Sequence, residues 1–200
     1  MTKIKYCGLT REQDIKVVNQ LKIDYVGFMF FKNSKRYISN ESARLLKNKL
    51  LPEIKSVGVF VNENIENIGA LHKEGIIDII QLHGKEDNDY ITELKKITKA
   101  PVIKAYSIQS EYDIEHANNS VADMVLLDSG SGGTGKVFNW DMLKGINRDY
   151  FLAGGLNVSN VQQAIDTLHP YGVDVSSGIE TDGLKDKNLM IKFAELIRGE

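Results

Sequence analysis

The chain alternates short apolar runs with longer segments in which apolar residues recur every three or four positions. Short apolar runs are typical of strands buried on both faces, and the longer spacing is typical of helices with one apolar face. The pattern predicts strands at residues 3–7, 25–30, 57–61, 77–82, 101–106, 124–128, 150–155 and 173–178. It predicts a helix after each strand, at residues 11–22, 39–50, 65–72, 90–97, 111–118, 139–144, 158–168 and 188–198.

Strands that alternate with helices pair in parallel, because each helix returns the chain to the same end of the sheet. Eight such units are what a closed (β/α)8 barrel of the TIM type needs, and 200 residues lie at the compact end of that fold. We therefore expect an α/β protein in which residues 1–200 form a single barrel domain, since no linker or repeat interrupts the pattern. An open, doubly wound parallel sheet is the competing architecture.

Polar residues and glycines collect where the predicted strands end. Cys7 ends the first strand, His83 follows the fourth and Asp128 ends the sixth. Paired glycines end the seventh strand, and a Ser-Ser-Gly run ends the eighth. The opposite ends of the strands show no comparable set. The carboxyl ends of barrel strands meet on one face, where the catalytic residues of this fold lie, so we expect these side chains around a single mouth.

The one cysteine and an aspartate are the candidate catalytic pair. Cys7 and Asp128 lie on strands far apart in the predicted barrel and should face each other across its mouth. Two ionisable groups on either side of a ligand suit an isomerisation, in which one group removes a proton and the other supplies one, better than a hydrolysis. Taken singly, Cys7 could instead be a small buried hydrophobe, and Asp128 could cap a loop.

A phosphate site is the second function that the pattern indicates. Gly154 and Gly155 follow the seventh strand, and Ser177 and Gly178 follow the eighth. Barrel enzymes bind phosphate at this place with backbone N–H groups, and glycine lets an oxyanion approach the backbone closely. A tight turn would explain the glycine pair alone, whereas the two neighbouring strand ends together favour phosphate.

Residues 130–137 form a glycine-rich segment, Gly-Ser-Gly-Gly-Thr-Gly-Lys-Val. It fits G-x-G-x-x-G and departs from a P-loop at Val137, where a magnesium-binding Ser or Thr would stand. One reading is a non-catalytic barrel that binds a nucleotide or another phosphorylated ligand through Gly130–Lys136. We favour a flap beside Asp128, with Gly133 at the mouth, that closes over the ligand and excludes water.

Composition limits the classes of partner that we expect for this protein. The chain has 25 basic and 27 acidic residues and a net charge of −2, so neither a nucleic acid nor an anionic membrane is an expected partner. A single cysteine excludes an internal disulfide framework and a cysteine-based zinc site. The amino terminus reads as a strand and not as a signal peptide, and no apolar run approaches the roughly 18 residues of a membrane span. We expect a cytoplasmic protein.

Six motifs follow one another along the chain. They are Lys-Tyr-Cys-Gly-Leu-Thr at 5–10, Gly-Phe at 27–28 leading to Ser-Lys-Arg at 34–36, Gln-Leu-His-Gly at 81–84, Leu-Asp at 127–128 leading to Gly-Gly-Thr-Gly at 132–135 and Phe-Asn-Trp at 138–140, Ala-Gly-Gly-Leu at 153–156, and Val-Asp-Val-Ser-Ser-Gly-Ile-Glu at 173–180. In this order they resemble the phosphoribosylanthranilate isomerase family. Two departures, Tyr6 for a frequent Ile and Lys35 for a frequent Pro, lie beside the functional residues.

The resemblance implies a (β/α)8 barrel that converts N-(5-phosphoribosyl)anthranilate to its 1-deoxyribulose 5-phosphate derivative by an Amadori rearrangement in tryptophan biosynthesis. It implies that Asp128 is the general acid that opens the ribose ring and that Cys7 is the general base at C2′. Arg36, after the second strand, would hold the anthranilate carboxylate, and the glycine and serine turns would bind the phosphate. The resemblance implies no metal or organic cofactor, and a monomer or homodimer. A sister sugar-phosphate isomerase shares the fold and chemistry, but its family uses a carboxylate base.

Strand alternation makes a further prediction beneath the mouth. If Cys7 points into the barrel, so does Lys5, and a buried ammonium needs a partner. Asp174, on the adjoining eighth strand, is the candidate. We expect Lys5 to favour the thiolate of Cys7 while burial opposes it. The alternative is that Lys5 turns aside to solvent at the barrel floor.

Overall fold

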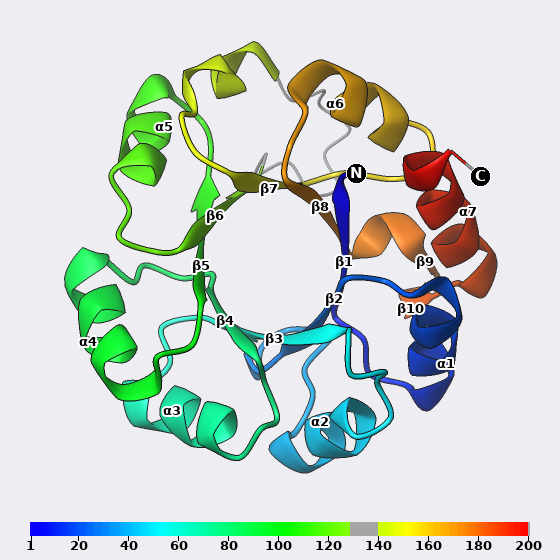
Figure 1. Ribbon diagram of the computed structural model, residues 1–200, viewed down its shortest axis with the longest axis horizontal. Coiled ribbons are helices and arrows are strands. Elements are labelled where there is room, and N and C mark those ends of the chain that lie inside the picture. Colours follow the sequence, from blue (N-terminus) through cyan, green and yellow to red (C-terminus); the bar gives the residue numbers. More distant parts are fainter. Residues whose placement is uncertain (129–139, 200) are drawn as a thin grey trace.

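Eight parallel strands close into a barrel (Figure 1). The protein is represented by a computed structural model that describes residues 1–128 and 140–199. Each strand pairs with the next, and β8 pairs with β1, which confirms the closed barrel and rules out the open sheet. The strands are β1 (Lys3–Cys7), β2 (Tyr25–Met29), β3 (Lys55–Phe60), β4 (Ile79–Leu82), β5 (Val102–Ser107), β6 (Met124–Asp128), β7 (Tyr150–Ala153) and β8 (Gly172–Val175).

Helices surround the strands on the outside of the barrel (Figure 1). The α-helices of the described residues are α1 (Glu12–Leu21), α2 (Asn40–Lys47), α3 (Ile65–Lys73), α4 (Asn88–Thr98), α5 (Glu111–Asn118), α6 (Val161–Leu168) and α7 (Lys187–Arg198). Four of these helices begin just after a polar residue whose side chain accepts a hydrogen bond from a backbone N–H of the first turn. These caps are Ser39, Asn64, Asp87 and Asp186.

Several predicted boundaries are wrong. The seventh strand ends at Ala153 and not at Gly155, and the helix predicted from residue 158 begins at Val161. The helix predicted through residue 50 ends at Lys47. The helix predicted at 139–144 is a 3₁₀ helix, η1 (Trp140–Gly145). The eighth strand ends at Val175, and the Ser-Ser-Gly run enters a 3₁₀ turn, η2 (Ser177–Ile179). A small antiparallel hairpin of β9 (Glu180–Thr181) and β10 (Leu184–Lys185) then leads to α7.

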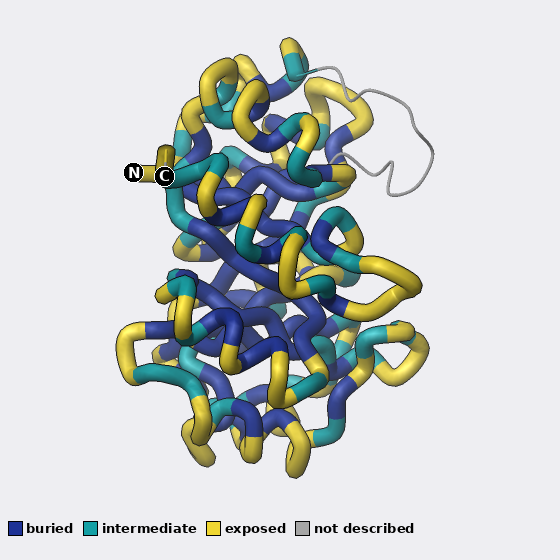
Figure 2. Tube along the Cα trace, turned by 90° about the vertical axis from the view of Figure 1, so that its right-hand side faces the viewer, coloured by how far each residue is buried: buried dark blue, intermediate teal, exposed yellow. Residues whose placement is uncertain are grey.

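A separate apolar core fills the barrel interior, inside the larger one between strands and helices. Its members are Tyr25, Val57, Ile79, Ile103, Ala105, Leu126, Phe151 and Ala153. Gly172 makes room for this core, since a Cβ there would lie 2.5 Å from Cε1 of Phe151. Figure 2 shows buried chain through the middle of the molecule and exposed residues on the outer turns. Inward residues farther along each strand therefore face the carboxyl-terminal mouth.

The amino-terminal face of the barrel carries a polar set that we did not expect. Three aspartates stand just before β2, β4 and β6: Asp24, Asp78 and Asp123. Each accepts a hydrogen bond from a backbone N–H near the start of the preceding strand, and the donors are Ile4, Ser56 and Val102. Each also pairs with a lysine, namely Lys3, Lys47 or Lys95. These aspartates fasten neighbouring strands together, as stability residues at this face of a barrel do.

Candidate active site

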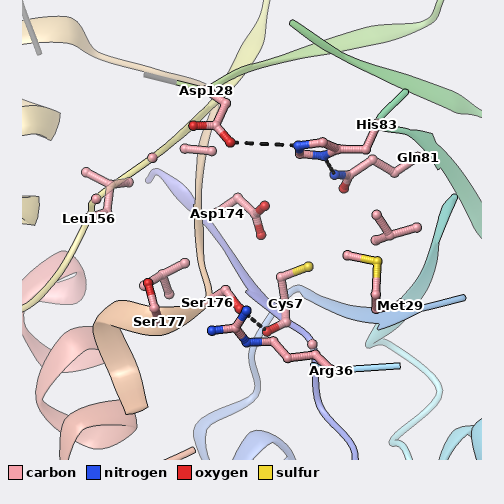
Figure 3. Close-up of a pocket in the computed structure, with 16 residues that line it drawn as sticks. Cys7, Met29, Arg36, Gln81, His83, Asp128, Leu156, Asp174, Ser176 and Ser177 are labelled. Carbon is pink, nitrogen blue, oxygen red and sulfur yellow. Dashed lines mark hydrogen bonds and ion pairs between the residues drawn. The ribbon is translucent and has the colours of Figure 1, made fainter. Parts of the chain in front are cut away.

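One pocket, with a volume of about 420 Å³, lies at the carboxyl ends of the strands (Figure 3). It has the size of a small-molecule site. Among the residues that line it are Cys7, Arg36, Gln81, His83, Asp128, Gly154, Gly155, Asp174, Ser176 and Ser177. The structure thus brings the predicted mouth residues together, except for two. Gly133 lies outside the described residues, as does the whole Gly130–Lys136 segment, and Gly178 lies behind the lining.

Cys7 lies at the carboxyl end of β1 and points into the pocket (Figure 3). The neighbouring strand makes room for it with Gly27, because a Cβ there would lie 2.7 Å from the Cys7 Sγ. Burial raises the pKa of the Cys7 thiol above its ordinary value. The positive charges of Lys5 and Lys185 oppose that rise, whereas the charge of Asp174 adds to it. Burial therefore favours the protonated thiol of Cys7, and the two nearby lysines favour its thiolate.

The predicted Lys5–Asp174 pair is present beneath Cys7. The Lys5 Nζ lies 2.8 Å from the Asp174 Oδ1, and the two side chains are 0% and 9% exposed. Burial lowers the pKa of Lys5, but the charges and hydrogen bonds of Asp174 and Cys7 outweigh it and raise the pKa above its ordinary value. Lys5 is therefore a charged ammonium inside the barrel, and the alternative in which it turns to solvent is wrong.

Asp128 faces Cys7 from the opposite side of the pocket, with Asp174 between them in the view of Figure 3. His83, which follows β4, stands beside Asp128, and its Nε2 lies 3.7 Å from the Asp128 Oδ2. Gln81 supports His83 from below with an Nε2–Nδ1 hydrogen bond of 3.0 Å. Sequence reasoning missed Gln81. The signal that could have found it is parity, since Gln81 lies two positions after the inward-facing Ile79.

Arg36 reaches the pocket from the loop after β2, and a carboxylate holds it there. Its Nε and Nη2 donate to the two carboxylate oxygens of Glu180 at 2.7 and 2.6 Å. Among residues 1–128 and 140–199, the Arg36 Nη1 has no hydrogen-bond partner. Burial raises the pKa of Glu180, but its bonds and charge interactions with Arg36 and Lys185 outweigh burial and hold the pKa below its ordinary value. The guanidinium is thus fixed by one edge.

Lys185 connects this ion pair to the backbone of Cys7. Its Nζ is buried and donates to Glu180 and to the Ser176 carbonyl, the latter at 2.9 Å. The Ser176 hydroxyl donates to the Cys7 carbonyl at 3.0 Å. The β9–β10 hairpin therefore fastens Arg36 and the end of β1 to each other. Sequence reasoning placed Ser176 at the mouth without naming its contacts and assigned no role to Glu180 or Lys185. The bonds of Glu180 to Arg36 and of Ser176 to Cys7 join segments far apart in the chain.

The two turns predicted to bind phosphate meet at one wall of the pocket. Gly154 and Gly155 have φ angles of 87° and 66°, which residues other than glycine rarely adopt. Gly178 allows the close approach of the two turns, since a Cβ there would lie 1.8 Å from the Leu156 carbonyl oxygen. The structure therefore assigns Gly178 a packing role. The phosphate role of Gly154, Gly155, Ser177 and Gly178 stays a prediction.

Two searches of the described ranges bear on cofactors and membranes. Residues 1–128 and 140–199 contain no group of three or more His, Cys, Asp or Glu side chains placed to hold a metal ion. In the same residues, no helix is both long and apolar enough to cross a membrane.

Comparisons with known proteins agree with this geometry. The model of the family described as N-(5'phosphoribosyl)anthranilate (PRA) isomerase matches residues 4–196. A relative with that activity in its name, from Thermoanaerobacter sp. (strain X514), is 48% identical over 205 residues, which cover 100% of this chain and 99% of the relative. The phosphoribosyl anthranilate isomerase structure from Thermotoga maritima matches with a TM-score of 0.91 and 37% identity, covering 100% of both chains. A second solved isomerase, in complex with reduced 1-(o-carboxyphenylamino)-1-deoxyribulose 5-phosphate, matches with a TM-score of 0.89 and 36% identity, again over 100% of both chains. The chain belongs to the N-(5'-phosphoribosyl)anthranilate isomerase family.

Proposed function

We propose that this protein catalyses the Amadori rearrangement of N-(5-phosphoribosyl)anthranilate to 1-(2-carboxyphenylamino)-1-deoxy-D-ribulose 5-phosphate, an aldose–ketose isomerisation in tryptophan biosynthesis. The observation that carries the proposal is the placement of Cys7 and Asp128 on opposite sides of one pocket. That is the arrangement that a proton removal and a proton donation on one ligand require. Arg36 and the paired-glycine turn, in other parts of the wall, suit the ligand's two anionic ends.

Ring opening is the first step, and Asp128 performs it as general acid. Its carboxylic acid gives a proton to the ribose ring oxygen, and the lone pair of the anthranilate nitrogen forms the C1′–N double bond as the C1′–O bond breaks. The product is an open-chain Schiff base with a hydroxyl at C4′. His83, 3.7 Å from Asp128, bears on how this carboxyl group is oriented.

Proton removal at C2′ is the second step, and Cys7 performs it as the base. The thiolate takes the C2′ proton, and the electrons of that C–H bond form the C1′–C2′ double bond of an enolamine while the electrons of the C1′–N double bond return to the nitrogen as its lone pair. The 2′-hydroxyl of the enolamine then becomes the ketone as C1′ gains a proton. The positive charge of Lys5 favours the thiolate that this step consumes. Electrons stay within the ligand, so the proposal invokes no cofactor.

The substrate's charged groups would orient it between the acid and the base. The anthranilate carboxylate would meet the Nη1 edge of Arg36, which Glu180 leaves open. The phosphate would bind the backbone of Gly154, Gly155, Ser177 and Gly178. Two anchors at the ends of a ligand hold its reacting carbons in place, which is a large part of what an isomerase must supply.

Membership of the family favours the isomerase over the nucleotide-binding reading of Gly130–Lys136. It also favours Cys7 as base over the carboxylate of a sister sugar-phosphate isomerase. We further propose that the protein acts in the cytoplasm as a monomer or homodimer, without nucleic-acid or membrane partners. One solved relative is a monomer form of a dimeric phosphoribosylanthranilate isomerase.

The test follows the fluorescence of freshly generated phosphoribosylanthranilate as it is consumed. We expect the parent protein to turn it over and the variants Cys7→Ser and Asp128→Asn to lose most of that activity. Failure of the parent to turn over would refute the function. Full activity in either variant would refute the mechanism.

A further inference from the structure

Gln81 is a buried amide at the floor of the pocket, and only one of its two polar atoms has a hydrogen-bond partner among the described residues. The side chain is 1% exposed, and its Nε2 is hydrogen-bonded to His83 (Figure 3). Its Oε1 is buried and has no hydrogen-bond partner within residues 1–128 and 140–199. Buried polar atoms without partners are rare in folded proteins and call for an explanation, because leaving one unbonded is costly.

We propose that Gln81 is a substrate-binding and positioning residue: its amide nitrogen fixes the tautomer of His83 toward Asp128, and its amide oxygen accepts a hydrogen bond from a ribosyl hydroxyl of the ligand. The proposal rests on the function proposed above. Among the described residues, it assigns a role to the one side-chain amide that lines this pocket.

The orientation of the amide follows from the three side chains together. When the Gln81 Nε2 donates to the His83 Nδ1, that nitrogen is an acceptor, so a neutral ring carries its proton on Nε2. Nε2 faces the Asp128 carboxyl at 3.7 Å, where an N–H is attracted to the carboxylate. While Asp128 is ionised, as at the alkaline pH of the first experiment below, the reversed amide would require a proton on Nδ1 and would set the Nε2 lone pair against the carboxylate oxygen. The arrangement therefore leaves the oxygen of Gln81, and not its nitrogen, for the ligand.

The chemistry of the missing partner is that of a hydrogen-bond donor. A phosphate and a carboxylate, the two charged ends of the proposed substrate, offer acceptors only. Donors lie between them, on the sugar hydroxyls and the amine. Cys7 has to reach C2′, so the hydroxylated carbons pass over the floor of the pocket, whereas the amine lies toward the aromatic ring and Arg36. A sugar hydroxyl is therefore the donor that Gln81 meets.

The first experiment reads the tautomer of His83 without any substrate. We expect nitrogen NMR of ¹⁵N-histidine-labelled protein, at alkaline pH, to show an unprotonated Nδ1 and a protonated Nε2 for His83. The variant His83→Asn identifies its signals among those of the four histidines. The variant Gln81→Glu puts a carboxylate at each ring nitrogen and is expected to give a ring protonated on both. A protonated Nδ1 in the neutral ring of the parent would overturn the proposal.

The second experiment measures affinity with three probes: reduced 1-(o-carboxyphenylamino)-1-deoxyribulose 5-phosphate, anthranilate and inorganic phosphate. We expect Gln81→Met, which keeps the size of the side chain, to weaken binding of the reduced sugar derivative about 3- to 10-fold, the loss of one neutral hydrogen bond. Anthranilate and phosphate should bind as before. Gln162→Met, on the exposed face of α6, is the matched control and should change nothing, and circular dichroism confirms that both variants fold.

The outcomes separate this proposal from the function itself. Unchanged affinity of Gln81→Met for the sugar derivative would overturn the proposal, and so would an equal loss for anthranilate, which would place the contact on the amine. If the parent bound the sugar derivative no better than phosphate alone, the proposed function would fail. The NMR measurement would still test whether Gln81 fixes the tautomer of His83.

Discussion

Replacing Lys5 by Met removes the positive charge beneath Cys7 and leaves an apolar side chain of similar length in its place. Lys5 lowers the pKa of Cys7, and Asp174 raises it. The pKa of the thiol should therefore rise in Lys5→Met and fall in Asp174→Asn, with the parent between them. The two variants should shift the thiol pKa in opposite directions, which a general loosening of the barrel would not produce.

The same substitution also has a cost in stability. Lys5 is completely buried, and its carboxylate partner is only 9% exposed. Breaking a buried ion pair on one side costs about 3–5 kcal/mol, most of it from the charge that is left behind. Asp174 lines the pocket and can be hydrated there, so the cost should lie near the lower limit. A typical domain has a free energy of unfolding of about 5–15 kcal/mol, so the variant should remain folded. The double variant Lys5→Met/Asp174→Asn should recover part of the loss.

The assay is the rate of alkylation of the thiol as a function of pH. Cys7 is the only cysteine of the chain, so every modified molecule reports the same site, and the thiolate is the species that reacts. Urea unfolding of each variant gives the free energy separately. A thiol pKa that is unchanged or lower in Lys5→Met, while the variant is folded, would refute the argument.

Three more predictions follow from single contacts. Gly27→Ala should lower kcat at least tenfold with normal folding, because its Cβ would lie 2.7 Å from the Cys7 Sγ; steady-state kinetics and thermal unfolding check this. Glu180→Gln should raise KM several-fold more than it lowers kcat, since it loosens one edge of Arg36; equal changes in both would contradict this role. Asp78→Asn should cost about 1–3 kcal/mol at neutral pH and leave activity unchanged. Burial raises the pKa of Asp78, but its bonds to Lys47 and Ser56 outweigh burial and hold the pKa below its ordinary value. The stability that these bonds supply is therefore present above the unfolded-state pKa and is lost as the pH falls through the folded-state pKa, which urea unfolding at several pH values measures.

The sequence predicts those parts of the structure that depend on local spacing. Eight apolar runs gave the eight strands, and strand alternation placed Lys5 beside Asp174 before any contact was known. The predicted end of β8 is wrong, because Ser176 is turned by a bond to Cys7, 169 residues away in the chain, and by a bond from Lys185 in the hairpin that follows. Glu180 was missed for the same reason. Contacts between distant loops leave no periodic trace in the sequence.

The proposed acid and the proposed base of the pocket are held by two different networks. On one side, Lys185 and Ser176 connect the carboxylate clamp to the backbone of Cys7 across the seam where β8 meets β1. On the other side, Gln81 and His83 lead from β4 to Asp128 on β6. The first set reaches Cys7 from β8 and the hairpin, and the second reaches Asp128 from β4, so each proposed proton-transfer group has its own supporting contacts. In the proposed function the substrate spans both networks, with an anchor at each end and the proposed acceptor of Gln81 at the floor of the pocket.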